Sequence, residues 1–156
     1  MKTILLSILL VTMTIFSVAQ KKVYELPKLS KENQLLTINR NTSIEKDEHG
    51  EYLKVAESKG EGIIWLPIEN FEDGTVTMEM RGKNVPQRSF IGIAFHGQND
   101  TTYDAVYCRP FNFHAVDSIQ KIHAVQYISH PLFTWKYLRE TRNGEFEKGI
   151  TNAPQP

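Results

Sequence analysis

Short stretches of the chain alternate between apolar and polar residues, or are wholly apolar, as half-buried and buried β-strands do. Alternation is clearest around Lys54 and over 75–81, where Val76, Met78 and Met80 share one side. Turn signals such as Asp73-Gly74 separate the stretches. We predict strands over 35–38, 52–55, 63–66, 75–81, 89–96, 103–113 and 122–129.

Sustained helical spacing occurs only in the segment 130–139. There Leu132, Trp135 and Leu138 are three residues apart, and Ser129 is a candidate N-cap. Many short strands with a single helix are typical of an all-β sandwich or barrel. We therefore predict an all-β fold.

The first 19 residues have the pattern of a signal peptide. Lys2 precedes an apolar stretch, and small residues end it at Ala19. The alternative is a membrane anchor, but the apolar stretch is shorter than the roughly 20 residues that span a bilayer. We expect cleavage near Ala19, export to the periplasm or the extracellular space, and one domain over 20–156 without a membrane span.

Composition excludes several partners and disulfide bonds. The chain has 156 residues, with 18 Lys and Arg against 18 Asp and Glu, and loss of Lys2 leaves one net negative charge. Such a balance lacks the basic surface that binds nucleic acid. Cys108 is the only cysteine, so no intrachain disulfide forms, and its apolar surroundings predict a buried, inert thiol.

Candidate chemistry lies between residues 90 and 137, which hold four of the five histidines. Tyr107 and Arg109 share one face of their strand. This face is either half of the hydrophobic core or a sugar site, because sugars need aromatic surfaces and side chains that hold adjacent hydroxyls. The candidate carbohydrate-binding residues are Tyr107, Arg109, Asn112, His123, Gln126 and Trp135.

Five pieces of sequence resemble one known family. They are Phe-Glu-Asp-Gly-Thr-Val (71–76), Phe-Ile-Gly-Ile-Ala-Phe (90–95), Tyr-Cys-Arg-Pro-Phe-Asn-Phe (107–113), His-Ala-Val-Gln-Tyr (123–127) and Trp-Lys-Tyr-Leu-Arg (135–139). They are similar to secreted bacterial domains of the concanavalin A-like lectin/glucanase superfamily, most of all to the 3-keto-disaccharide hydrolase domain family. The resemblance implies a jelly-roll sandwich of two antiparallel sheets that engages saccharides. It also implies further strands after residue 139, so we expect the chain to be truncated at its C-terminus.

The sequence departs from the glucanases of that superfamily because it lacks their Glu-x-Asp-x-x-Glu run. Glu145 and Glu147 are expected to be solvated, so ordinary glycoside hydrolysis is not predicted. Saccharide binding is the leading hypothesis. One alternative is a hydrolase or lyase acting on 3-keto-glycosides with His123 as general base, and another is a structural or protein-binding sandwich. The histidines lack short ligand spacings, so we predict no metal and no cofactor.

Overall fold

The computed structural model describes residues 21–68, 71 and 73–154. The predicted signal peptide, residues 1–19, lies outside them. In chain order the elements are α1 (Leu26–Lys31), β1 (Leu36–Ile38), β2 (Thr42–Asp47), β3 (Gly50–Val55), β4 (Ile63–Trp65), β5 (Ile91–Phe95), β6 (Tyr103–Cys108), the 3-10 turn η1 (Pro110–Asn112), α2 (Ser118–Ile122), β7 (Val125–His130), α3 (Trp135–Thr141) and β8 (Glu147–Lys148).

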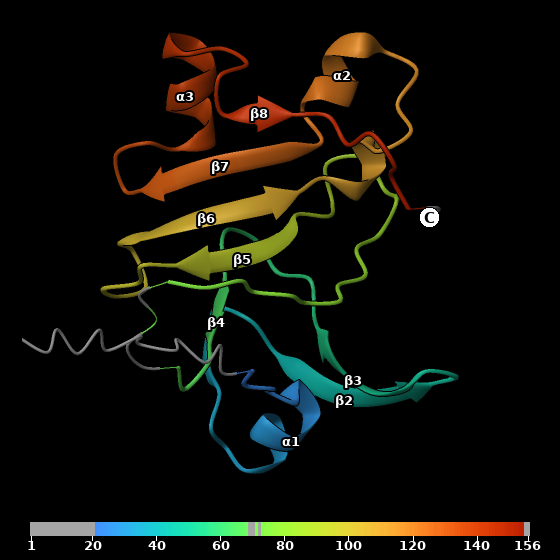
Figure 1. Ribbon diagram of the computed structural model, residues 1–156, viewed down its shortest axis with the longest axis vertical. Helices are drawn as coiled ribbons and strands as arrows, with labels where there is room; N and C mark the ends of the chain where they lie inside the picture. The colour runs from blue at the N-terminus through green and yellow to red at the C-terminus, as the bar shows by residue number, and fades with distance from the viewer. Residues whose placement is uncertain (1–20, 69–70, 72, 155–156) are drawn as a thin grey trace, which may run out of the picture.

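The largest sheet has four strands in the order β5-β6-β7-β8, and every neighbouring pair is antiparallel (Figure 1). The other strands form two antiparallel pairs, β1 with β4 and β2 with β3. The prediction of a β-rich fold with antiparallel sheets is thus confirmed for the described residues. The jelly-roll sandwich stays a prediction.

One face of the large sheet carries the side chains that matter below. Tyr103, Ala105 and Tyr107 alternate along β6, and Arg109 continues the same parity just beyond the strand. The register of β6 with β7 places Tyr107 opposite Gln126. Since a slip of one residue would turn these side chains to the other face, the register itself positions them.

The hydrophobic core lies on this same face. Tyr103, Ala105 and Ile128 of the sheet pack with Leu138 of α3. Trp65 of β4 contacts Tyr103 edge to face, with 6.2 Å between ring centroids. β4 and α3 therefore both contribute to covering the face.

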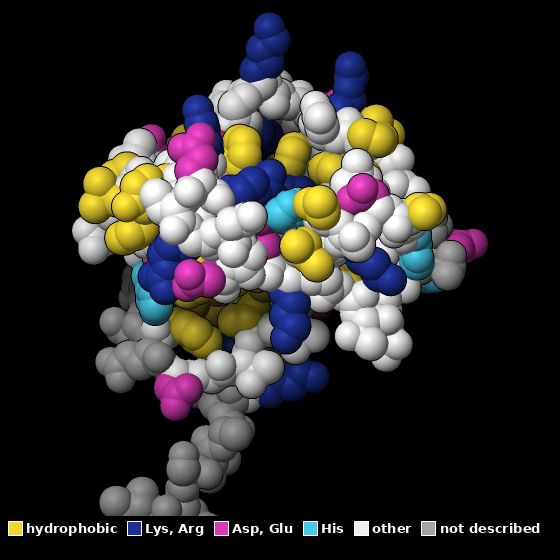
Figure 2. All heavy atoms as spheres, turned by 90° about the horizontal axis from the view of Figure 1, so that it is seen from above, with side chains coloured by type: hydrophobic (Ala, Val, Ile, Leu, Met, Phe, Trp, Pro, Cys, Tyr) yellow, Lys and Arg dark blue, Asp and Glu magenta, His cyan; other side chains and the backbone are white. Residues whose placement is uncertain are grey.

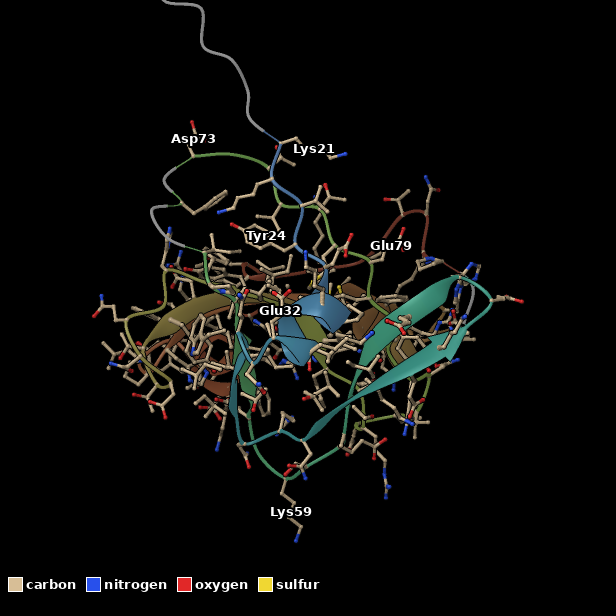
Figure 3. The ribbon with its side chains drawn as sticks, turned by 90° about the horizontal axis from the view of Figure 1, so that it is seen from below. Lys21, Tyr24, Glu32, Lys59, Asp73 and Glu79 are labelled. Carbon is tan, nitrogen blue, oxygen red and sulfur yellow. The ribbon has the colours of Figure 1, made fainter. Side chains whose placement is uncertain are left out.

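The N-terminal part of the chain is built on the β2–β3 hairpin. Asp47 pairs with Gly50, whose φ of +119° suits glycine. The strand predicted over 52–55 is confirmed, whereas its partner Thr42–Asp47 was not predicted as a strand. α1 packs on β3, where Lys31 and Glu51 form an ion pair of 2.6 Å. Figure 3 shows α1 beside the hairpin, with Lys59 pointing outward from the loop between β3 and β4.

The prediction of a strand over 75–81 is wrong. These residues lie outside every strand, and Val76, Met78 and Met80 are exposed. Alternation tells which residues would share a face, but a strand also needs a neighbour to bond its backbone. No backbone hydrogen bond is made by this segment to the described residues.

The helix predicted over 130–139 begins later than expected. Ser129 and His130 still belong to β7, where His130 pairs with Tyr103. Thr134 is the N-cap instead, and its hydroxyl accepts a hydrogen bond from the backbone N–H of Tyr137 at 3.3 Å. Pairing of the strand overrides the helical spacing at the start of the segment.

Two further boundaries differ from the prediction. Extended structure ends at Cys108, and Pro110 opens the turn η1, so Phe111 and Phe113 do not continue the strand. The segment before His123 is α2, capped by Asp117, whose side chain accepts from the N–H of Gln120 at 2.8 Å.

No helix in the described part of the chain is long and apolar enough to cross a membrane.

Candidate functional site

Arg109 is the centre of a buried polar network. Its backbone N–H donates to the carbonyl of Ala124 at 2.7 Å, which holds the residue in line with β6. The side chain is 6% exposed. Its guanidinium donates to the carbonyl of His123 (2.8 Å), the hydroxyl of Tyr107 (3.0 Å) and Oε1 of Gln126 (3.1 Å).

Glu147 of β8 supplies the negative charge of the network. Its side chain is 2% exposed, so the prediction that it is solvated is wrong. Arg109 Nη1 donates to Oε1 at 3.3 Å. Arg139, on α3, donates to the same carboxylate twice: its Nε to Oε2 at 3.2 Å, and its Nη2 to Oε1. Pairing of β8 with β7 brings the carboxylate here, since Glu147 is opposite Gln126.

The pKa of the Glu147 carboxyl is lowered. Burial by itself acts to raise it, but the hydrogen bonds and charge of Arg139, with the charges of His123 and Arg109, outweigh that effect. A carboxylate that is taken out of water is stable only when such partners surround it. Glu147 is therefore ionised at neutral pH.

His123 is the third basic group at this carboxylate. Its Nδ1 lies 2.7 Å from Glu147 Oε2 but does not have the geometry of a hydrogen bond to it. The ring keeps 13% of its surface exposed. His123 follows α2 directly, so the short helix delivers it to the sheet. We call Arg109, His123, Arg139 and Glu147 the ionic cluster.

Two amide side chains fix the backbone around the ionic cluster. Gln126 is fully buried, and its Nε2 donates to the carbonyls of Tyr127 (3.0 Å) and Phe146 (3.3 Å). Asn112, in η1, donates to the carbonyl of His123 at 3.3 Å. Both amide nitrogens, and Oε1 of Gln126, are thus engaged inside the protein.

The aromatic rings of Tyr107 and Phe90 pack beside Arg109 of the ionic cluster. The two rings meet edge to face with 6.0 Å between centroids, and Arg109 lies 5.1 Å from the Tyr107 ring and 5.9 Å from the Phe90 ring. Burial raises the pKa of the Tyr107 hydroxyl. The phenol therefore stays neutral and accepts the hydrogen bond from Arg109.

Trp135 lies at the exposed margin, at the first residue of α3. The residue is 42% exposed, and the Arg139 guanidinium stands 5.3 Å from the ring centroid. Residues four apart share a helix face, so the contact follows from the helical spacing. Seen from the end of the molecule that carries α2 and α3, basic and histidine side chains lie in the middle, with hydrophobic side chains around them (Figure 2).

The structure brings together five of the six predicted site residues and connects Trp135 to them through Arg139. In this structure Arg109, Asn112 and Gln126 are buried and hydrogen-bonded to their neighbours, and their contact with sugar hydroxyls stays a prediction. Sequence reasoning missed Arg139 and Glu147. The four-residue spacing from Trp135 was a usable signal for Arg139, whereas nothing in the sequence distinguishes Glu147 from Glu145.

A second titratable group lies near β4. The Tyr103 hydroxyl donates to Glu61 Oε2 at 3.2 Å, and burial, followed by the Glu61 charge, raises its pKa to about 12. His130 stacks on the Tyr103 ring, with 5.0 Å between centroids. Cys108 is half-buried and not buried as predicted, and burial raises the pKa of its thiol.

In the described part of the chain no group of three or more His, Cys, Asp or Glu side chains is placed to hold a metal ion. What the site offers is an exposed indole, a guanidinium beside it and a histidine against a buried carboxylate.

Comparison of the chain with known proteins gives no match to a family model, to a curated protein or to a solved structure. The concanavalin A-like resemblance stays a prediction from the sequence.

Proposed function

We propose that this protein is exported and engages saccharides through Trp135. The observation that carries the proposal is the half-exposed indole beside Arg139. The apolar face of a sugar ring packs on an aromatic ring, and charged or amide groups at its edge bind hydroxyls. The resemblance to concanavalin A-like domains, with their jelly-roll sandwich, supports the same function.

The rigid surroundings of Trp135 also favour binding. Arg139 is held on the Glu147 carboxylate, and that carboxylate is held by Arg109 and the sheet. Groups that are already fixed lose little conformational freedom when a ligand binds. In this proposal the partly buried Tyr107 and the buried Asn112 and Gln126 support the site, and Trp135 makes the main sugar contact.

Replacement of Trp135 by Ala should weaken saccharide binding at least tenfold, because the stacking surface is lost. Calorimetric titration of the exported chain with laminarin, xyloglucan and polygalacturonate would measure it. The matched control is Tyr137→Ala, which removes the ring of a similarly exposed residue (46%) from the same helix. Two residues further along a helix lies nearly the opposite face, so this variant should bind as the wild type does.

No binding to any of these glycans would contradict the proposal. So would equal loss of binding in the two variants, because it would indicate a general effect on α3 and not a contact made by Trp135.

A second candidate function is hydrolysis or elimination on a 3-keto-glycoside. His123 favours it, because its ring is partly exposed beside the buried Glu147 carboxylate and a general base must be able to reach the substrate proton. A proton next to a ketone is acidified, and removing it needs no carboxylate pair. For a 3-keto-glucoside, product formation should fall at least about 100-fold in His123→Gln. Unchanged substrate after prolonged incubation with the wild type would exclude the enzyme and leave the binding protein.

A further inference from the structure

We propose that the saccharide bound at Trp135 is acidic, and that Arg139 binds the carboxylate of a uronic acid residue stacked on the indole. The inference rests on the proposed function and names the class of its ligand. Three properties of Arg139 carry it: a free donor edge, an excess of positive charge and a fixed position.

Arg139 has donors to spare. Its Nε and one Nη2 hydrogen serve Glu147, but Nη1 has no hydrogen-bond partner among the described residues. A guanidinium carries five N–H donors, two of them on Nη1. The side chain is 33% exposed, so a ligand can reach it from the side of Trp135.

The charges around Arg139 leave one positive charge in excess. Arg109 and Arg139 each carry one positive charge and share the single carboxylate of Glu147, so the net charge of these three side chains is +1. The other charged side chains of α3 and its following turn pair with each other, Lys136 with Glu140 and Arg142 with Glu145. An anionic ligand would balance this excess.

The shape of a uronate matches the fixed pair of side chains. Its pyranose ring has an apolar face for stacking, and its carboxylate projects from the ring edge. The Arg139 guanidinium stands over the Trp135 ring, 5.3 Å from its centroid, so a sugar unit that stacks on the indole surface left exposed lies next to the guanidinium. A hydrogen bond between guanidinium and carboxylate is charge-assisted and stronger than one to a hydroxyl.

The decisive experiment compares polygalacturonate with the same polymer after full methyl esterification, both titrated into the wild-type chain by calorimetry. Esterification removes the carboxylate charge and keeps the sugar ring, and it requires no change to the protein. We expect at least tenfold weaker binding of the ester. Arg139→Gln should remove this preference by weakening only the binding of the free acid.

Two variants control for folding and for general charge. Arg142→Gln removes an exposed arginine of the same region that lies 5.0 Å from the Phe146 ring and pairs with Glu145, and it should keep the preference. If Arg139→Gln fails to fold, Arg139→Lys keeps the charge but not the planar fork, and should show a reduced preference.

The outcomes separate the two proposals. Equal binding of acid and ester, lost in both cases in Trp135→Ala, would overturn the acidic ligand and keep the saccharide function. Binding of the acid alone that does not depend on Trp135 would indicate non-specific attraction to positive charge and would overturn the inference. No binding of any glycan would overturn the proposed function as well.

Discussion

Replacing Glu147 with Gln is expected to lower the free energy of unfolding by about 3 kcal/mol, and the Tm by on the order of 10 °C. The amide keeps the shape of the side chain but not its charge. Arg109, 6% exposed, would then lie buried without a counter-charge. Removing one partner of a buried ion pair is far more damaging than removing an exposed one.

Thermal unfolding followed by circular dichroism would measure the change, with Glu145→Gln as matched control. Glu145 is two residues away and pairs with Arg142, but its side chain is 54% exposed, so its removal should change stability by less than about 0.5 kcal/mol. Similar Tm values for the two variants would contradict the role of the ionic cluster.

The same comparison should depend on pH. Because the pKa of Glu147 is lowered in the folded protein, its contribution is fully present above the unfolded pKa and is lost as pH falls through the folded pKa. The difference in stability between the wild type and Glu147→Gln should therefore be large at neutral pH and shrink in acid. A difference that stays constant down to strongly acidic pH would be inconsistent with ionisation of this carboxyl.

Replacing Leu138 with Ala is expected to lower the free energy of unfolding by about 3 kcal/mol. Leu138 is 2% exposed and is the residue of α3 that enters the core beside Ile128. A helix of seven residues is not stable by itself, so it depends on this packing. Loosening α3 would also displace Trp135 and Arg139, and saccharide binding should fall with stability.

Urea unfolding of Leu138→Ala and Leu132→Ala would test this prediction. Leu132 lies just before the same helix and is 74% exposed, so its truncation should have an effect within about 0.5 kcal/mol. A folded Leu138→Ala variant of wild-type stability would show that α3 is held by other contacts.

Six of the eight strands in the described residues were predicted from the sequence, whereas β2 and β8 were not. The alternation in 103–108 placed Tyr103 and Tyr107 on one face, and the structure agrees. The segment 75–81 has an equally clear alternation but no strand, because pairing depends on neighbours that the pattern does not name. α1 and α2, with six and five residues, are too short to show a helical period.

Prediction of the candidate site was limited by long-range pairing. Arg109 and Gln126 were both named as sugar-binding candidates from their residue types, and the structure joins them by a hydrogen bond. Glu147 reaches that group only through the register of β8 with β7, and its local sequence resembles that of exposed Glu145. Burial of a carboxylate is decided by this distant contact and is not encoded in the residues next to it.

The order of strands in the large sheet has a consequence for how the chain folds. β5, β6, β7 and β8 are neighbours in space in the same order as in sequence, and all four members of the ionic cluster lie between residues 109 and 147. Closing a short loop costs less conformational entropy than joining distant segments, and proteins whose contacts are mainly local fold fast. The C-terminal half should therefore form its sheet and gather its charged groups early, with β4 adding Trp65 to an already ordered face.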